Sequence, residues 1–138
     1  MFLSEDRQWP VPATNPENAP FFAAAAEGRL LIGRCEACGK AHYYPRRSCP
    51  HCFSDRVDWQ PASGRGHIHT YTVAAAASDR QVLAFIDLEE GVRMLSNLVD
   101  APAARLAGGA AVAAPVRVAF ARAGTVCVPV FVLDEERA

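Results

Sequence analysis

Apolar and polar residues alternate along much of the second half of the chain, and each alternating run predicts a β-strand. With a period of two, successive side chains lie on opposite faces of a sheet, so one face is buried while the other meets solvent. Glu89-Glu90-Gly91 predicts the turn of a hairpin between two of these runs. Pro129 inside the last run suits an edge strand or a bulge. The runs cover residues 68–72, 82–88, 92–99, 116–120 and 126–133.

These five strand regions favour a small closed barrel over a two-sheet sandwich. A long irregular connection, residues 101–111, separates the third region from the fourth, and the OB fold is the five-stranded barrel that this arrangement favours. Ahead of them, Val57 and Trp59 begin the same period, and Gly64-Arg65-Gly66 then breaks it. The break predicts a bend or turn of the strand, not a phosphate-binding loop.

An arm and a short helix are expected at the start of the chain. Pro10, Pro12 and Pro16 predict an extended arm over residues 1–19. Asn18 is the expected N-cap of a helix of about two to three turns, and Gly28 is its expected end. A helix this short is stable only when one of its faces packs against something else.

Two aromatic pairs are candidates for contact with another protein. Phe21-Phe22 lies on the apolar side of the expected helix, and Tyr43-Tyr44 lies between the two halves of the cysteine array described next. The pattern leaves open whether each pair packs against the protein's own core or whether the two pairs form a surface that a partner covers.

Four cysteines in the pattern C-x2-C-x10-C-x2-C are the strongest chemical signal in the sequence. Each C-x2-C step lets one tight turn direct two thiolates at one metal, and two such turns complete the tetrahedron that Zn²⁺ prefers. A closed tetrahedron of this kind is structural, because no coordination position is left for water or substrate. Gly39 follows the first pair, where a positive φ suits glycine, whereas Phe53 stands at that place after the second. The predicted ligands of this rubredoxin-like zinc ribbon are Cys35, Cys38, Cys49 and Cys52.

Other interpretations of the cysteines are less favoured. His42 and His51 are possible substitute ligands, but four cysteines already complete the shell. A redox C-x-x-C site or two disulfides would suit a βαβ context or a secreted protein. The first seven residues lack the charged-then-apolar order of a signal peptide, so we expect a cytoplasmic protein with reduced thiols. Cys127, between two valines, is expected to be a small core residue and not a nucleophile.

Composition narrows the function. With 51% hydrophobic residues in 138, the chain can form a real core, and no apolar run approaches the length of a membrane span. The net charge of -1 argues against binding nucleic acid through phosphates, although a local basic patch stays possible. His67 and His69 share one strand face and are expected to be surface residues. No nucleophile has an adjacent base, so we assign no catalytic residue.

In combination, these motifs resemble the acyl-CoA-associated family of zinc-ribbon OB-fold proteins, formerly a domain of unknown function. The resemblance covers residues 16–133, and departures are Phe53 and the alanine-rich segment 105–114. It implies three parts: an arm and helix (1–29), a zinc ribbon (30–56) and an OB-fold domain (57–138). The resemblance rests on the expected helix and on the two C-x2-C knuckles, residues 35–40 and 49–53. It also rests on Gly28-Arg29-Leu30-Leu31, Tyr44-Pro45-Arg46, Thr70-Tyr71-Thr72-Val73 and the hairpin at residues 87–93.

The resemblance implies an accessory role more than a reaction. Family members sit beside thiolase-like enzymes, including lipid-transfer-protein-type thiolases and aldolases, or beside hot-dog-fold enoyl-CoA hydratases, and some help to bind or hand on a CoA thioester. Arg46 and Arg65, with Arg47, are therefore candidates for contact with a CoA phosphate. The alternatives are a nucleic-acid-binding OB-fold module and a free-standing acyl-CoA-binding protein or enzyme. The acyl chain, the partner's reaction and the stoichiometry stay open.

Overall fold

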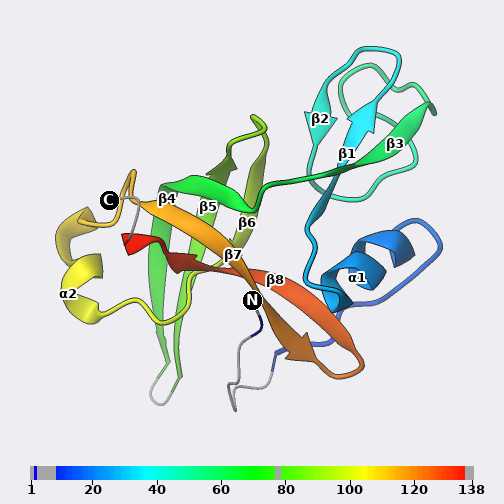
Figure 1. Ribbon diagram of the computed structural model, residues 1–138. Helices are drawn as coiled ribbons and strands as arrows, with labels where there is room; N and C mark the ends of the chain where they lie inside the picture. Colours follow the sequence, from blue (N-terminus) through cyan, green and yellow to red (C-terminus); the bar gives the residue numbers. More distant parts are fainter. Residues whose placement is uncertain (1, 3–8, 77–78, 136–138) are drawn as a thin grey trace.

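The computed structural model describes residues 2, 9–76 and 79–135 as a helix, a small ribbon sheet and a barrel sheet (Figure 1). Part of the predicted arm, residues 1 and 3–8, lies outside the described residues. The elements in chain order are α1 (Ala19–Ala26), β1 (Leu31–Cys35), β2 (Ala41–His42), β3 (Val57–Pro61), β4 (Arg65–Ala76), β5 (Asp79–Leu88), β6 (Arg93–Asn97), α2 (Ala103–Leu106), the 3-10 turn η1 (Ala107–Gly109), β7 (Pro115–Ala123) and β8 (Val126–Leu133).

Helix α1 lies where the sequence predicts it, and Asn18 occupies the predicted N-cap position. Asn18 precedes the helix without a capping hydrogen bond from its side chain. Its Oδ1 instead accepts a hydrogen bond from the N–H of Asn15, and its Nδ2 donates to the carbonyl of Ala13. The buried Asn18 side chain therefore ties the arm to the helix. Gly28, with φ of 77°, ends the helix as expected.

The ribbon sheet has the order β2-β1-β3, and β1 pairs antiparallel with both neighbours. Strand β3 pairs along the whole of β1, from Leu31 opposite Pro61 to Cys35 opposite Val57. The alternation at Val57 and Trp59 therefore belongs to the ribbon sheet. We propose that the ribbon and barrel modules meet in residues 62–64.

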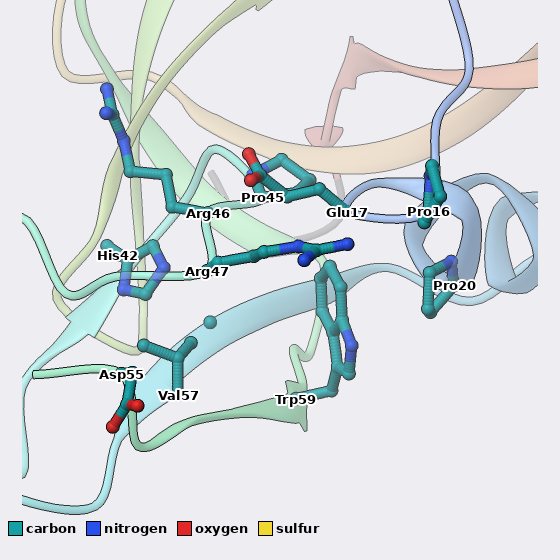
Figure 2. A pocket seen from close by; sticks show the side chains of 11 residues that line it. Pro16, Glu17, Pro20, His42, Pro45, Arg46, Arg47, Asp55, Val57 and Trp59 are labelled. Carbon is teal, nitrogen blue, oxygen red and sulfur yellow. The ribbon is translucent and has the colours of Figure 1, made fainter.

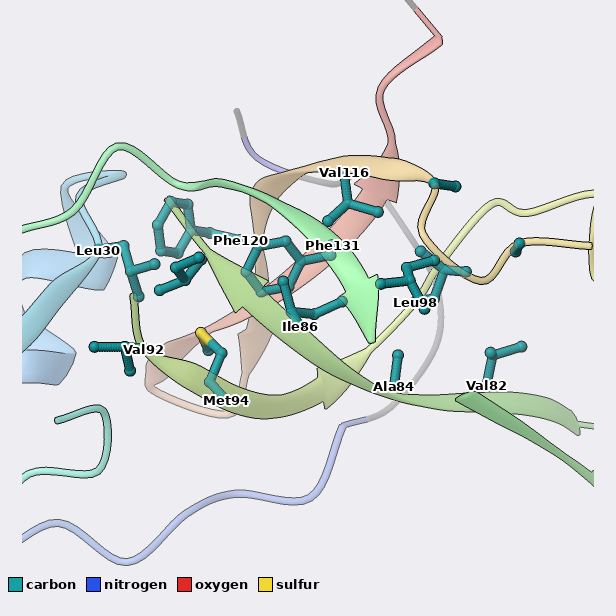
Figure 3. Packing of buried hydrophobic residues seen from close by; sticks show 14 of the residues in the cluster. Leu30, Val82, Ala84, Ile86, Val92, Met94, Leu98, Val116, Phe120 and Phe131 are labelled. Carbon is teal, nitrogen blue, oxygen red and sulfur yellow. The ribbon is translucent and has the colours of Figure 1, made fainter. Parts of the chain in front are cut away.

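The second sheet has the order β6-β5-β4-β7-β8 and curls into a nearly closed barrel. Its two edge strands approach each other at Leu98 and Phe131, where Val99 donates a hydrogen bond to the carbonyl of Phe131 at 2.9 Å. Phe120, Phe131, Ile86 and other apolar side chains fill the interior (Figure 3). The prediction of a mostly β protein with an N-terminal helix, a ribbon and a five-stranded OB-fold barrel is confirmed.

The linker between the modules is held against the β5–β6 turn. The N–H of Ser63 donates to Oε2 of Glu90 at 2.7 Å. The Arg65 guanidinium forms an ion pair with Oε2 of Glu89 at 3.4 Å. A Cβ on Gly64 would meet Val118 at 2.3 Å, and one on Gly66 would meet the carbonyl oxygen of Asp87 at 2.4 Å. The glycines thus allow close approach of strands, as the predicted bend requires. Among the described helices, none has the length and apolar character needed to cross a membrane.

Candidate metal centre and the ribbon surface

The four predicted ligands converge at the end of β1, whose last residue is Cys35. All four Sγ atoms lie within 4.8 Å of one another. The Sγ atoms of Cys35 and Cys52 are 3.6 Å apart, and those of Cys38 and Cys49 are 3.7 Å apart. Zn–S bonds of about 2.3 Å give a tetrahedral S–S edge of about 3.8 Å. The thiols therefore fit a zinc ion, as a structural zinc ribbon requires.

Each knuckle also supplies backbone donors to its first sulfur. The N–H of Cys38 donates to Sγ of Cys35, and the N–H of His51 donates to Sγ of Cys49. Such donors stabilise a thiolate and fix the direction in which it presents its lone pairs. Cys35 and Cys49 are buried, whereas Cys38 and Cys52 are exposed, so one side of the centre faces solvent.

The thiol pKa values show how the cluster behaves without a cation. The N–H of Cys38 outweighs burial and lowers the pKa of Cys35 to about 7. Burial raises the pKa of Cys49, but the N–H groups of Cys52 and His51 reverse that shift, so its net direction is downward. The N–H of Ser54 lowers the pKa of Cys52, yet burial and the neighbouring sulfurs raise it to about 11. Zinc binding therefore displaces the protons that the thiols carry near neutral pH.

His42 is not part of this cluster of ligands. Its side chain is 6% exposed and lies over Gly33, where an added Cβ would come within 2.3 Å of Nε2. Neither ring nitrogen has a hydrogen-bond partner among the described residues. Burial lowers the pKa of His42, and the nearby charges of His51 and Arg46 act in the same direction. His42 is thus a neutral packing residue of the ribbon.

Replacing His42 by leucine is expected to leave the protein as stable as the wild type at pH 7.5. The stability of the variant should then change less with pH than that of the wild type. Because the folded chain lowers the His42 pKa, the unfolded chain takes up the proton first as the pH falls below 6.5. This contribution to stability is present above that pH and is lost on acidification. Thermal unfolding of zinc-saturated wild type and His42→Leu from pH 7.5 to 5.5 measures the difference. Parallel curves would show that the imidazole is not held neutral.

A cavity of about 340 Å³ lies beside His42, between the ribbon and the start of α1 (Figure 2). Arg46 and Arg47, from the loop between the knuckles, line this cavity, and Trp59 of β3 lines it as well. Neither arginine forms an ion pair with any described residue. The place of Trp59 in this cavity cannot be predicted from the sequence, because its alternating pattern resembles that of any strand residue. The remaining lining residues are Pro16, Glu17, Pro20, Gly33, His42, Pro45, Asp55 and Val57.

The aromatic pairs mainly hold the helix against the ribbon. Phe21 is 3% exposed and contacts both Phe22 and Tyr43 edge-on, with ring centroids 5.1 and 6.0 Å apart. Burial, followed by the proximity of Tyr44, raises the pKa of Tyr43 to about 12. Tyr44, at 55% exposed, is the outermost ring of the group. Phe21 thus packs internally, whereas Phe22, Tyr43 and Tyr44 stay partly exposed and line a hollow. That a partner covers this hollow stays a prediction.

The other candidate residues are dispersed over the barrel. Arg65 is paired with Glu89 and does not line the cavity that holds Arg46. His69 is exposed at a β-bulge, 3.8 Å from Asp87, whose pKa Arg93 lowers by hydrogen bonding. His67 is likewise exposed on β4. Cys127 is half-buried and packs against the core.

Family models of known proteins match the ribbon and the barrel of this chain separately. The ChsH2 rubredoxin-like zinc ribbon domain matches residues 22–58, and the ChsH2 C-terminal OB-fold domain matches residues 59–121. The solved structure titled Ltp2-ChsH2(DUF35) aldolase has a TM-score of 0.75 and 33% identity, covering 89% of this chain and 98% of that chain. The chain belongs to the ChsH2-type DUF35 family. The family resemblance seen in the sequence is thereby confirmed.

Two curated relatives are subunits of CoA-dependent enzymes by name. A probable enoyl-CoA hydratase alpha subunit of Thermomonospora curvata is 41% identical over 95 residues, which is 65% of this chain and 30% of that protein. The benzoylsuccinyl-CoA thiolase subunit BbsA of Thauera aromatica is 30% identical over 106 residues, 66% of this chain and 74% of that protein. This chain therefore matches less than a third of the length of the hydratase subunit.

Proposed function

We propose that this chain is a non-catalytic accessory subunit that binds and stabilises a thiolase-like catalytic subunit of acyl-CoA metabolism. The observation that carries the proposal is the likeness to the ChsH2 chain, which spans nearly all of that chain and whose structure is titled as an aldolase formed with Ltp2. The thiolase subunit BbsA supports the same role in a second CoA-dependent enzyme. The two chains form a hetero-oligomer, in which this chain supplies a surface that binds the catalytic subunit and a ribbon that zinc makes rigid.

The arrangement of polar side chains supports a binding role. The four cysteines would saturate a zinc ion, so the metal would have no open position for a substrate. Glu90 is held by the linker, and Asp87 is held by Arg93. In the described residues we find no nucleophile beside a base that an orienting group positions in turn.

Direct contact with the CoA thioester is the finer part of the proposal. Arg46 is the better placed of the two candidates for a CoA phosphate, because it lines a cavity and has no acidic partner among the described residues. Arg65 would first have to leave Glu89. Guanidinium groups bind phosphate in a bidentate manner, which favours Arg46 as the residue that touches a CoA held mainly by the partner.

A hydratase is the second candidate for the catalytic partner. The relative from Thermomonospora curvata, named as a hydratase alpha subunit, favours a hot-dog-fold enoyl-CoA hydratase in that place. The accessory role of this chain is the same in both cases. What differs is whether the chain supports a thiolase-like enzyme or a hydratase.

A nucleic-acid-binding role is less well supported. The outer face of β4, β5 and β6 carries an apolar hollow whose exposed side chains include Phe85 and Leu95. None of the residues that line this hollow is basic, whereas nucleic-acid-binding OB folds combine stacking rings with cationic side chains there. The lining residues are Thr70, Tyr71, Thr72, Leu83, Phe85 and Leu95.

Co-elution tests the proposal. The chain is co-expressed with a thiolase-like subunit encoded beside it, or with a hydratase subunit if one is encoded there, and the mixture is separated by size exclusion with light scattering. We expect one stable complex. Calorimetric titration of an acyl-CoA into the isolated chain should give little or no heat, and tight binding by the isolated chain would favour the free-standing acyl-CoA-binding protein instead.

A further inference from the structure

The second zinc knuckle contains a phenylalanine where its backbone geometry favours glycine. In the first knuckle Gly39 donates to the carbonyl of Cys35 at 2.8 Å, and in the second Phe53 donates to the carbonyl of Cys49 at 2.9 Å. The two positions are equivalent, with φ of 77° at Gly39 and 65° at Phe53. A left-handed backbone is strained for any side chain with a Cβ, and most of all for a bulky one. The knuckle itself therefore gives no reason for Phe53.

Packing within the chain does not explain Phe53 either. Its side chain is 80% exposed, more than any other large apolar residue in the described part of the chain. A strained backbone that holds an aromatic ring in solvent lowers stability twice, through the dihedral angle and through the unburied apolar surface. Such an outlier indicates a role outside the folded chain.

The loop that leads into this knuckle is positively charged. Residues 39–48 contain Lys40, Arg46 and Arg47 and no acidic residue. Arg47 lines the cavity that Asp55, two residues beyond Phe53, also lines. By contrast, Arg56 is paired with Glu36 across the ribbon at 3.6 Å. Residues 39–56 together contain four cationic residues and one acidic residue, Asp55, so the segment that carries the exposed ring has an excess of positive charge.

We propose that Phe53 is the anchor by which the ribbon docks into an apolar pocket with an acidic rim on the catalytic subunit. Aromatic and arginine side chains dominate the energetics of protein interfaces, and a central ring surrounded by charge is the usual arrangement. Burial of the ring against the partner offsets the strain that the free chain carries. Arg47 faces the acidic rim and sets the salt dependence of binding. This inference rests on the proposed function, since it names the chemistry of the partner's surface.

Replacement of Phe53 by glycine tests the docking role. Phe53→Gly removes the ring and relieves the backbone, so the melting temperature of the zinc-loaded chain should stay unchanged or rise by up to about 4 °C. The Kd for the purified catalytic subunit should nevertheless increase at least about tenfold in calorimetric titration. A residue with only a structural role would not weaken binding while preserving stability.

The matched control is Ala113→Gly. Ala113 is also exposed and has φ of 69°, but it lies before β7, so glycine there relieves the same strain without touching the ribbon. Its Kd should equal that of the wild type. As a second arm, Arg47→Glu should weaken binding and reduce its salt dependence, whereas Arg122→Glu on the barrel should not. Arg47 is chosen because Arg46 is the CoA candidate.

Each outcome separates the docking proposal from the proposed function. If the wild-type chain binds the catalytic subunit and Phe53→Gly binds equally well, the docking proposal is overturned and the accessory role stands. If the wild-type chain binds neither the thiolase-like nor the hydratase subunit, the accessory role and the docking proposal both fail. Weakened binding of Phe53→Gly together with an unchanged Ala113→Gly supports the anchor.

Discussion

Replacing Cys35 and Cys49 together by serine abolishes zinc binding and unfolds the ribbon, with the largest loss of stability expected anywhere in the chain. Structural zinc contributes an apparent free energy of about 10–16 kcal/mol to small ribbons, far more than three short strands supply. Strand β2 spans only Ala41–His42, so without the metal the ribbon sheet depends mainly on the pairing of β1 with β3. The zinc content measured by metal analysis should fall from about one equivalent per chain to nearly none. Hydrogen exchange should show residues 31–61 unprotected while the barrel strands stay protected.

The matched control for this variant is Cys127→Ser. Cys127 lies on β8, outside the metal cluster, so its replacement should keep the zinc content and the protection of the ribbon. Unchanged protection of residues 31–61 in the metal-free double variant would show that the four cysteines do not hold a structural metal. The same conclusion would follow from less than about half an equivalent of zinc in carefully prepared wild type.

Gly66→Ala is expected to destabilise the barrel by about 3 kcal/mol, a large effect for a single methyl group. The new Cβ would lie 2.4 Å from the carbonyl oxygen of Asp87 and 3.1 Å from Cγ2 of Ile86. Gly66 pairs with Leu88 in the β4–β5 ladder, so strand separation is the only relief, and it weakens the hydrogen bonds between the two strands. Urea unfolding of the zinc-loaded protein measures the loss, which corresponds to a fall in melting temperature of roughly 10 °C.

Gly91→Ala separates this clash from the general effect of replacing glycine. An added Cβ at Gly91 meets nothing within 4 Å, although its φ of 86° still disfavours alanine. We expect a loss of about 1 kcal/mol from the backbone alone. Equal losses at Gly66 and Gly91 would contradict the close approach of β4 and β5.

Much of this fold can be predicted from the sequence, because its main signals are local. The spacing of the cysteines determines the knuckles, and alternation such as that of Val82 to Leu88 reappears as alternating burial along β5. Gly28 and Gly39 take the positive φ that their places suggest. Each of these features depends on a few neighbouring residues, so a pattern is sufficient to reveal it.

Features that depend on distant contacts could not be predicted in this way. The alternation at Val57 and Trp59 gives no sign that β3 pairs with β1, because a strand's pattern does not name its partner. Asn18 is the N-cap residue, but its side chain makes no capping hydrogen bond, because its oxygen already accepts one from the N–H of Asn15. The cavity between Trp59 and the arginines likewise arises only when the loop between the knuckles folds back on β3.

Reconstitution of activity tests the central claim most directly. The zinc-loaded chain, the candidate catalytic subunit and their mixture are each assayed for turnover of an acyl-CoA substrate, with the same catalytic concentration throughout. We expect no turnover by this chain alone, low or rapidly lost activity of the catalytic subunit alone, and full, lasting activity of the mixture. Turnover by the isolated chain would contradict a non-catalytic subunit. A catalytic subunit equally active and stable without this chain would contradict the accessory role.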